Sequence, residues 1–160
     1  MSGNEVDLII SNEIKFDYKP DAIPYQCRLT YKISIVVLIL KLTSSSRGGT
    51  SLSKIHLIST YMYSGDEREV LMRYLKGSED SYIVLRYDPL INKTIDFIVA
   101  EKLIIQQKNG LFKLTPNGRK YSDKLLSDDG ILVTEKEYLN QIGENLSEQL
   151  IKNIERSLIG

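Results

Sequence analysis

The sequence is poor in the side chains that most often build a catalytic centre or a metal site. Its 160 residues include one histidine, one cysteine and no tryptophan. A hydrolytic triad needs a positioned base, and a zinc site needs several cysteine or histidine ligands. Because His56 and Cys27 are each alone and far apart in the sequence, we expect no enzymatic activity, no metal and no cofactor.

The chain also lacks features of exported and membrane proteins. A single cysteine allows no intramolecular disulfide, which fits a reducing cytoplasm. Residues 1–4 have no basic stretch, and the acids Glu5 and Asp7 interrupt the next few apolar residues, so no secretory signal is expected. The most apolar run, 33–40, is much shorter than the roughly 20 residues needed to cross a bilayer. We therefore expect a cytoplasmic protein.

No charge of one sign predominates. Lysine plus arginine equals aspartate plus glutamate, at 21 each, and the isoelectric point is about 6.6. Dedicated DNA-binding domains are more often clearly basic. Overall neutrality argues against DNA as the main partner, although a local basic patch remains compatible with it.

The stretch 82–119 carries the clearest structural pattern. Residues 82–87 are β-branched and aromatic, which favours a short strand. Asp88-Pro89 is a typical helix start, and apolar residues then recur at helical spacing at Ile91, Ile95, Ile98 and Val99. Asn109-Gly110 predicts a tight hairpin. Thr115-Pro116 repeats the helix-start signal.

Strand, helix, hairpin and helix in this order predict a winged helix, with the hairpin as its wing. We expect the strand at 82–87 to pair with the hairpin. In the hairpin, Phe112 and Leu114 alternate with Lys113, which predicts one packed face and one exposed face. The expected fold class is mainly α with a small antiparallel β-sheet (α+β), a winged helix with a C-terminal helical extension.

Two sequence segments resemble motifs of known families. DPLINKTIDFIVAEKLI (88–104) and NGLFKLTPNG (109–118) resemble the phrase shared by MarR-like and PadR-like winged-helix regulators. With the long apolar helix before them, residues 28–126 look more like the middle component of three-component ABC ATPase systems, the Lamassu-type bacterial defence operons. That resemblance implies a non-catalytic subunit that bridges an SMC-like ABC ATPase and a nuclease-like effector in anti-phage or anti-plasmid defence.

The alternative function is a MarR/PadR-like transcription regulator, in the form of a homodimer, with the helix from Asp88 in the major groove. That helix carries Asp96 and Glu101, and it offers only Asn92 and Lys93 as plausible base readers. Recognition helices normally present Arg, Lys, Asn or Gln to bases and avoid acids near phosphates. The charge pattern therefore favours the subunit.

The chain divides into three expected regions. Residues 1–24 form an acidic arm, 25–130 form the winged-helix domain, and 131–160 form a C-terminal helix. Within the domain, 25–43 is the most apolar segment, and its part 33–40 is apolar nearly all round, which predicts a central buried helix or a helix that partly faces another subunit. A loop at 44–50 leads to an amphipathic helix at 51–63, where His56 is expected on the surface or in packing.

Basic residues define the expected contacts with nucleic acid. No acid lies between Ile104 and Tyr121, and a positive wing can follow a phosphate backbone. The Gly-Gly loop before the helix at 51–63 lacks the spacing of a P-loop. Weak, non-specific DNA contact is therefore expected through six residues: Arg47, Lys54, Lys108, Lys113, Arg119 and Lys120.

The C-terminal region predicts one long helix from Thr134, with Thr134 and Glu137 as a capping box. An apolar stripe then recurs at three- and four-residue intervals. It can pack on the domain's own core or form a helix-in-groove contact with a partner. The residues of this candidate partner interface are Leu139, Ile142, Leu146, Leu150 and Ile154.

Overall fold

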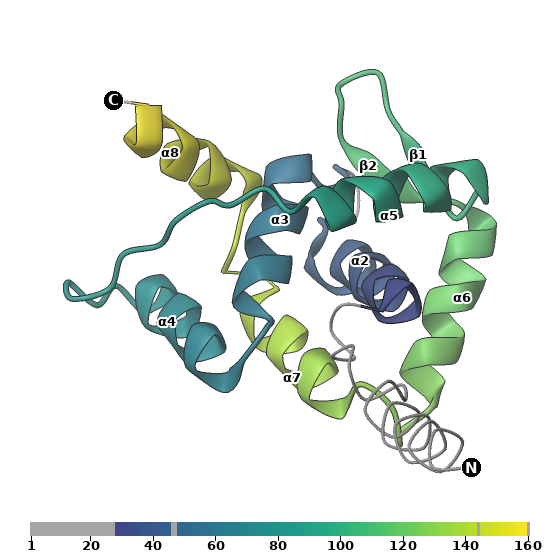
Figure 1. Cartoon of the computed structure of the whole chain (residues 1–160), viewed down its shortest axis with the longest axis horizontal. Coiled ribbons are helices and arrows are strands. Elements are labelled where there is room, and N and C mark those ends of the chain that lie inside the picture. Colours follow the sequence, from purple (N-terminus) through teal and green to yellow (C-terminus); the bar gives the residue numbers. More distant parts are fainter. Residues whose placement is uncertain (1–27, 46–47, 144, 160) are drawn as a thin grey trace, which may run out of the picture.

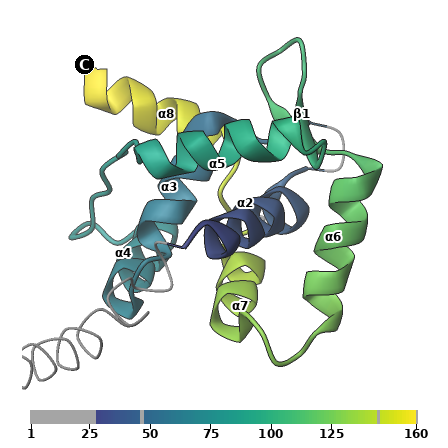
Figure 2. The same cartoon turned by 45° about the vertical axis from the view of Figure 1, so that its right-hand side comes forward.

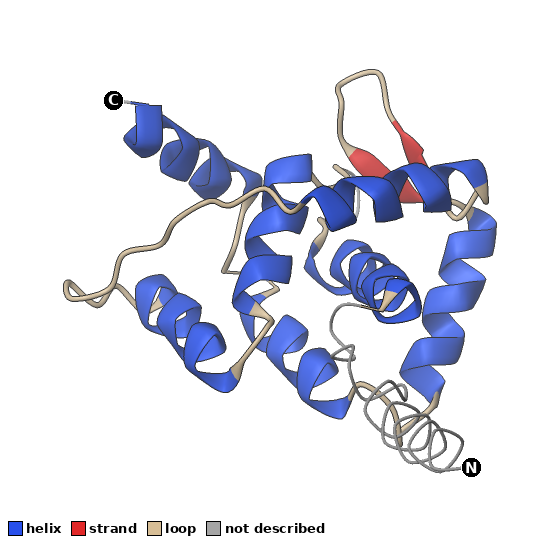
Figure 3. Cartoon of the chain, in the orientation of Figure 1, coloured by secondary structure: helices blue, strands red, loops and turns tan. Residues whose placement is uncertain are grey.

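The computed structural model describes residues 28–45, 48–143 and 145–159. Within them the chain is mainly helical with one small antiparallel sheet, the coarse α+β class expected from the sequence (Figures 1 and 3). The arm at 1–24, Cys27 and Arg47 lie outside the described residues. The elements are α2 (Leu29–Thr43), α3 (Leu52–Tyr61), α4 (Gly65–Leu75), α5 (Pro89–Ala100), β1 (Ile104–Gln106), β2 (Phe112–Leu114), α6 (Pro116–Ser127), α7 (Val133–Ile142) and α8 (Glu148–Ile159).

Helix α2 is the centre of the fold. It lies between α3, α5, α6 and α7 in two views of the molecule (Figures 1 and 2), and it contacts each of them as well as β2. The run from Ile35 to Leu40 is buried on every side of the helix. Each such aliphatic side chain contributes roughly 1.5–3 kcal/mol when it leaves water. The expectation of a central buried helix is confirmed.

Side-chain caps start helices α3, α5 and α6, and the last two begin at the Asp88-Pro89 and Thr115-Pro116 signals of the sequence. The side chain of Ser51 accepts from Lys54 N–H, that of Asp88 from Leu90 N–H at 2.8 Å, and that of Thr115 from Gly118 N–H at 3.0 Å. Pro89 and Pro116 follow two of these caps, where a missing N–H costs no helical bond. These starts are therefore set by local chemistry.

The predicted hairpin is present. Ile104 pairs with Leu114 and Gln106 with Phe112 in an antiparallel register. Gly110 has φ +86°, a conformation that glycine adopts without strain, and Asn109 Oδ1 accepts from Leu111 N–H. Phe112 and Leu114 are buried while Lys113 is exposed, as the alternation predicted.

The strand predicted at 82–87 does not form. This segment is a long connection from α4 to α5 without a sheet partner (Figure 3), and Val84 N–H donates to the Tyr61 hydroxyl at 2.8 Å. Thr50 takes the place beside the hairpin: its N–H and C=O each bond to Phe112 at 2.8 Å. Both edges of β2 are thereby occupied, so residues 82–87 cannot pair with β2.

The prediction of a single C-terminal helix from Thr134 is wrong, because α7 and α8 are separate helices. Thr134 is not the cap; Leu132 stands at that position in a left-handed conformation, with no side-chain cap bond. Gly143 ends α7 against α2, where an added Cβ would lie 2.6 Å from the Leu42 carbonyl oxygen. This close approach leaves no room for a side chain at position 143.

The stripe proposed as a partner interface lies in the chain's own core. Four of its members are buried, and the fifth, Leu150, is half-buried against the same core. The turn after Gly143 lets both α7 and α8 direct apolar side chains inward. This corrects the partner-interface assignment of Leu139, Ile142, Leu146, Leu150 and Ile154.

Candidate functional site

The predicted nucleic-acid contacts separate into different environments. Lys108, Lys113, Arg119 and Lys120 are all exposed on the hairpin or on α6. Lys113 and Arg119 also border a cavity that Lys41, at the end of α2, completes from a third element. Lys108 and Lys120 do not line this cavity. The structure thus groups two of the four with a lysine that sequence reasoning did not select.

Lys54 is not a surface contact. Only 2% of it is exposed, and its Nζ donates to the Thr43 carbonyl oxygen at 2.6 Å. Burial lowers the pKa of Lys54, while the nearby Glu148 carboxylate acts in the opposite direction. This ammonium joins α3 to the end of α2, and the expectation that it meets a phosphate backbone is corrected.

Helix α5 presents a mixed face to solvent. Phe97 is 43% exposed and Val99 39% exposed, which corrects the placement of Val99 on the buried face with Ile91, Ile95 and Ile98. Lys93 and Asp96 are exposed beside them. In β1, which follows and contacts α5, Ile105 is 46% exposed. Phe97 and Val99 are two residues apart, so they lie on opposite sides of the helix, with Lys93 and Asp96 between them.

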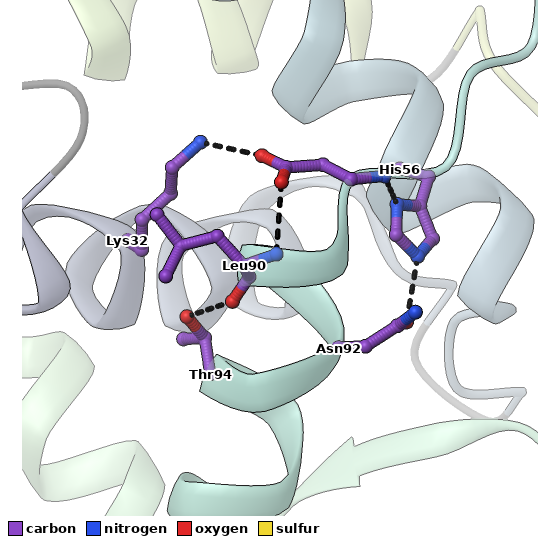
Figure 4. A network of polar contacts seen from close by, with 6 residues as sticks. Lys32, His56, Leu90, Asn92 and Thr94 are labelled. Carbon is purple, nitrogen blue, oxygen red and sulfur yellow. Dashed lines mark hydrogen bonds and ion pairs between the residues drawn. The ribbon is translucent and has the colours of Figure 1, made fainter.

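Asn92, one of the two candidate base readers, is held from inside the protein. His56 accepts at Nδ1 from Asp88 N–H at 3.0 Å, so the neutral ring carries its proton on Nε2. Nε2 then donates to Asn92 Oδ1 at 2.9 Å (Figure 4). His56 itself is fully buried, which agrees with the expectation of a packing residue.

The same network joins α2 to the start of α5. Lys32 Nζ bonds to Asp88 Oδ2 at 3.1 Å, and Thr94 Oγ1 donates to the Leu90 carbonyl (Figure 4). Burial raises the pKa of Asp88, but the Leu90 N–H and the Lys32 ammonium outweigh it, so this pKa lies below its usual value. Burial lowers the pKa of His56. The polar groups satisfy one another, as a structural network should.

The C-terminal helix extends this network. Ser53 bonds to the Tyr87 hydroxyl at 3.2 Å and donates to a carboxylate oxygen of Glu155 in α8. The ring of Tyr87 meets that of His56 edge to face, with centroids 4.8 Å apart. These contacts place α8 beside α3. Glu155 of α8 therefore helps to hold the fold together.

Within the described parts of the chain, no three His, Cys, Asp or Glu side chains gather in a way that could hold a metal ion. None of the helices in those parts is both long enough and apolar enough to cross a membrane. Searches of protein families, curated proteins and solved structures find no match to this chain. The function is therefore inferred from the exposed face of α5 and from the basic residues of the hairpin and α6.

Proposed function

We propose that this protein is a non-catalytic winged-helix subunit that bridges an SMC-like ABC ATPase and a nuclease-like effector in a bacterial defence complex. Residues 88–104 and 109–118 resemble the sequence motif of winged-helix regulators, which supports the fold assignment. The order α2, Thr50 bridge, α3, α5 and hairpin supports it too. Helix α4 and the connection after it are then an insertion between the second and third helices.

The observation that carries the proposal is the exposed face of α5. In a DNA-reading winged helix this face would lie in the major groove. Here its middle shows Lys93 and the acid Asp96, Phe97 and Val99 border it on opposite sides, and the side chain of Asn92 is bonded to His56. Aromatic and aliphatic side chains at a surface suit a protein interface better than a phosphate-lined groove. We assign this face to the contact with the ATPase subunit.

The hairpin adds a weaker role. Lys108 at its turn and Lys120 on α6 are exposed cations that suit auxiliary, non-specific contact with a DNA backbone. The alternative, a MarR/PadR-like homodimeric regulator, would require sequence-specific binding through α5. Its distinguishing property is tight binding to one duplex by the protein alone.

The test is co-purification with the products of neighbouring genes that encode an ABC ATPase and an effector. Phe97→Asp with Val99→Asp should abolish the complex, because burying carboxylates in an apolar contact is costly. Both side chains are partly exposed, so the variant should keep its thermal transition. Leu158→Asp, at a residue 50% exposed on α8, is the matched control and should still bind.

Two results would overturn the proposal. One is a complex that survives the double substitution on α5. The other is nanomolar binding of the isolated protein to a specific duplex together with a homodimer in solution, which would establish the regulator instead.

A further inference from the structure

A cavity lies where the end of α2, the loop after it, β2 and the start of α6 meet. Its volume is about 360 Å³. This is many times the roughly 10–15 Å³ that one water molecule needs by the same measure. It has room for a phosphate group together with part of the molecule that carries it.

Positive charge converges on this cavity from three separate elements. Lys41 comes from α2, Lys113 from β2 and Arg119 from α6, and the hydroxyl residues Ser44 and Ser45 also border it. No Asp or Glu is among the described residues that line it. Three cations at one concave site repel one another, and a bound anion would relieve that repulsion.

One carboxylate lies near the rim and partly neutralises the site. Asp123 pairs with Lys41 Nζ at 3.3 Å, but the Asp123 side chain is 65% exposed. An exposed pair of this kind contributes only about 0–1 kcal/mol. A phosphate with two negative charges can therefore compete for Lys41 at little cost.

Backbone contacts hold the wall of the cavity. Gly49 has φ +79°, and an added Cβ there would lie 2.8 Å from the Phe112 carbonyl oxygen, so the loop runs tightly against β2. Gln107 Nε2 donates to the Gly48 carbonyl at 3.4 Å. Arg119 Nη1 donates to the Leu114 carbonyl at 3.3 Å, which orients the guanidinium and leaves its other donors for a ligand.

We propose that this cavity is a phosphate-binding site in which Lys41, Lys113 and Arg119 contact the phosphate oxygens. Arginine supplies paired, directional donors and the two lysines supply compact charge. The phosphate can belong to a small phosphorylated molecule or to a nucleic-acid backbone, since both offer the same oxygens. The site does not require the proposed contact with an ATPase, because none of its residues lies on α5.

The experiment uses the full chain at low salt and isothermal titration calorimetry. The probes are pyrophosphate, ATP, and one duplex of random sequence. The site variant combines Lys41→Gln, Lys113→Gln and Arg119→Gln. The control combines Lys108→Gln, Lys120→Gln and Lys124→Gln, which removes the same charge from exposed positions outside the cavity.

We expect the wild type to bind at least one probe and the site variant to lose about tenfold or more in affinity, the effect of 1.4 kcal/mol. The control should stay within about twofold of wild type for pyrophosphate or ATP. Binding of these two probes without the duplex identifies a small ligand. Binding of the duplex alone, with loss in the site variant exceeding loss in the control, identifies a nucleic-acid phosphate.

Failure to bind any probe would overturn the proposal, and so would equal losses in the two triple variants, which indicate diffuse charge. If the triple site variant does not fold, Lys113→Glu replaces it, because the Lys113 side chain is exposed. Titrations on the isolated protein leave the ATPase contact untouched, so failure here is distinct from failure of the proposed function.

Discussion

Two groups of polar side chains differ in where their hydrogen bonds go. At the start of α5, His56, Asp88, Lys32 and Asn92 bond to one another within the protein. At the base of the hairpin, Lys113 and Arg119 face a cavity, and the Arg119 guanidinium donates to the Leu114 carbonyl with one of its five N–H groups. The comparison teaches that charged groups bonded to one another inside the protein serve the fold, whereas those that line a cavity are candidates for binding.

The strongest test of the first group is His56→Ala. The substitution leaves a cavity in the core and removes the partners of Asp88 N–H and Asn92 Oδ1. We expect the free energy of unfolding to fall by about 3 kcal/mol. Urea denaturation followed by circular dichroism measures it, with Lys93→Ala on the exposed face of α5 as the control. A loss no larger than that of the control would contradict a structural role for the network.

Stability should also depend on pH through His56. Its pKa is lowered in the folded state, so below about pH 6.5 the unfolded chain binds more protons than the folded one. The contribution is complete above that pH and is lost as the pH falls. From pH 7 to 5.5 we expect a loss of about 1 kcal/mol, measured by urea denaturation at each pH.

His56→Gln provides the control for this pH effect, because it removes the only histidine in the chain. Its stability should change less between pH 7 and 5.5 than that of the wild type. Asp88, whose pKa is also lowered, gives a second and separate loss as the pH falls below about 4. An equal response of both proteins near pH 6 would assign the effect to another group.

The smallest effect is expected at the hairpin. Lys113→Gln with Arg119→Gln should change the free energy of unfolding by no more than about 0.5 kcal/mol, because both side chains are exposed and make few internal bonds. The same urea denaturation measures it. A loss as large as that of His56→Ala would show that these cations hold the fold together, and the distinction between the two groups would fail.

Sequence reasoning succeeded where neighbours in the chain determine structure. The caps at Asp88 and Thr115, the turn at Asn109-Gly110 and the alternation around Lys113 all depend on residues a few positions apart. The uninterrupted apolar run of α2 also implied burial on every side, because no face of that helix could remain in water. These elements therefore follow from local patterns.

It failed where a distant partner determines the outcome. Residues 82–87 have strand propensity, but Thr50 already occupies the free edge of β2. The stripe from Leu139 to Ile154 has the spacing of one helix, but α7 ends at Ile142 and α8 begins at Glu148, so its members lie on separate elements. Propensity describes the conformation that a segment favours by itself. Whether the segment adopts that conformation depends on its tertiary contacts.

The candidate site shows the same division. The sequence by itself determined that Lys113 is exposed and that Arg119 follows a helix start, because strand alternation and capping are local. Only the tertiary structure shows that Lys41 lines the same cavity as these two residues. It also shows that Lys54 is buried and bonded to the Thr43 carbonyl. The physical reason is that an ammonium's role depends on which groups lie within hydrogen-bond reach, and here those groups come from segments far apart in the chain.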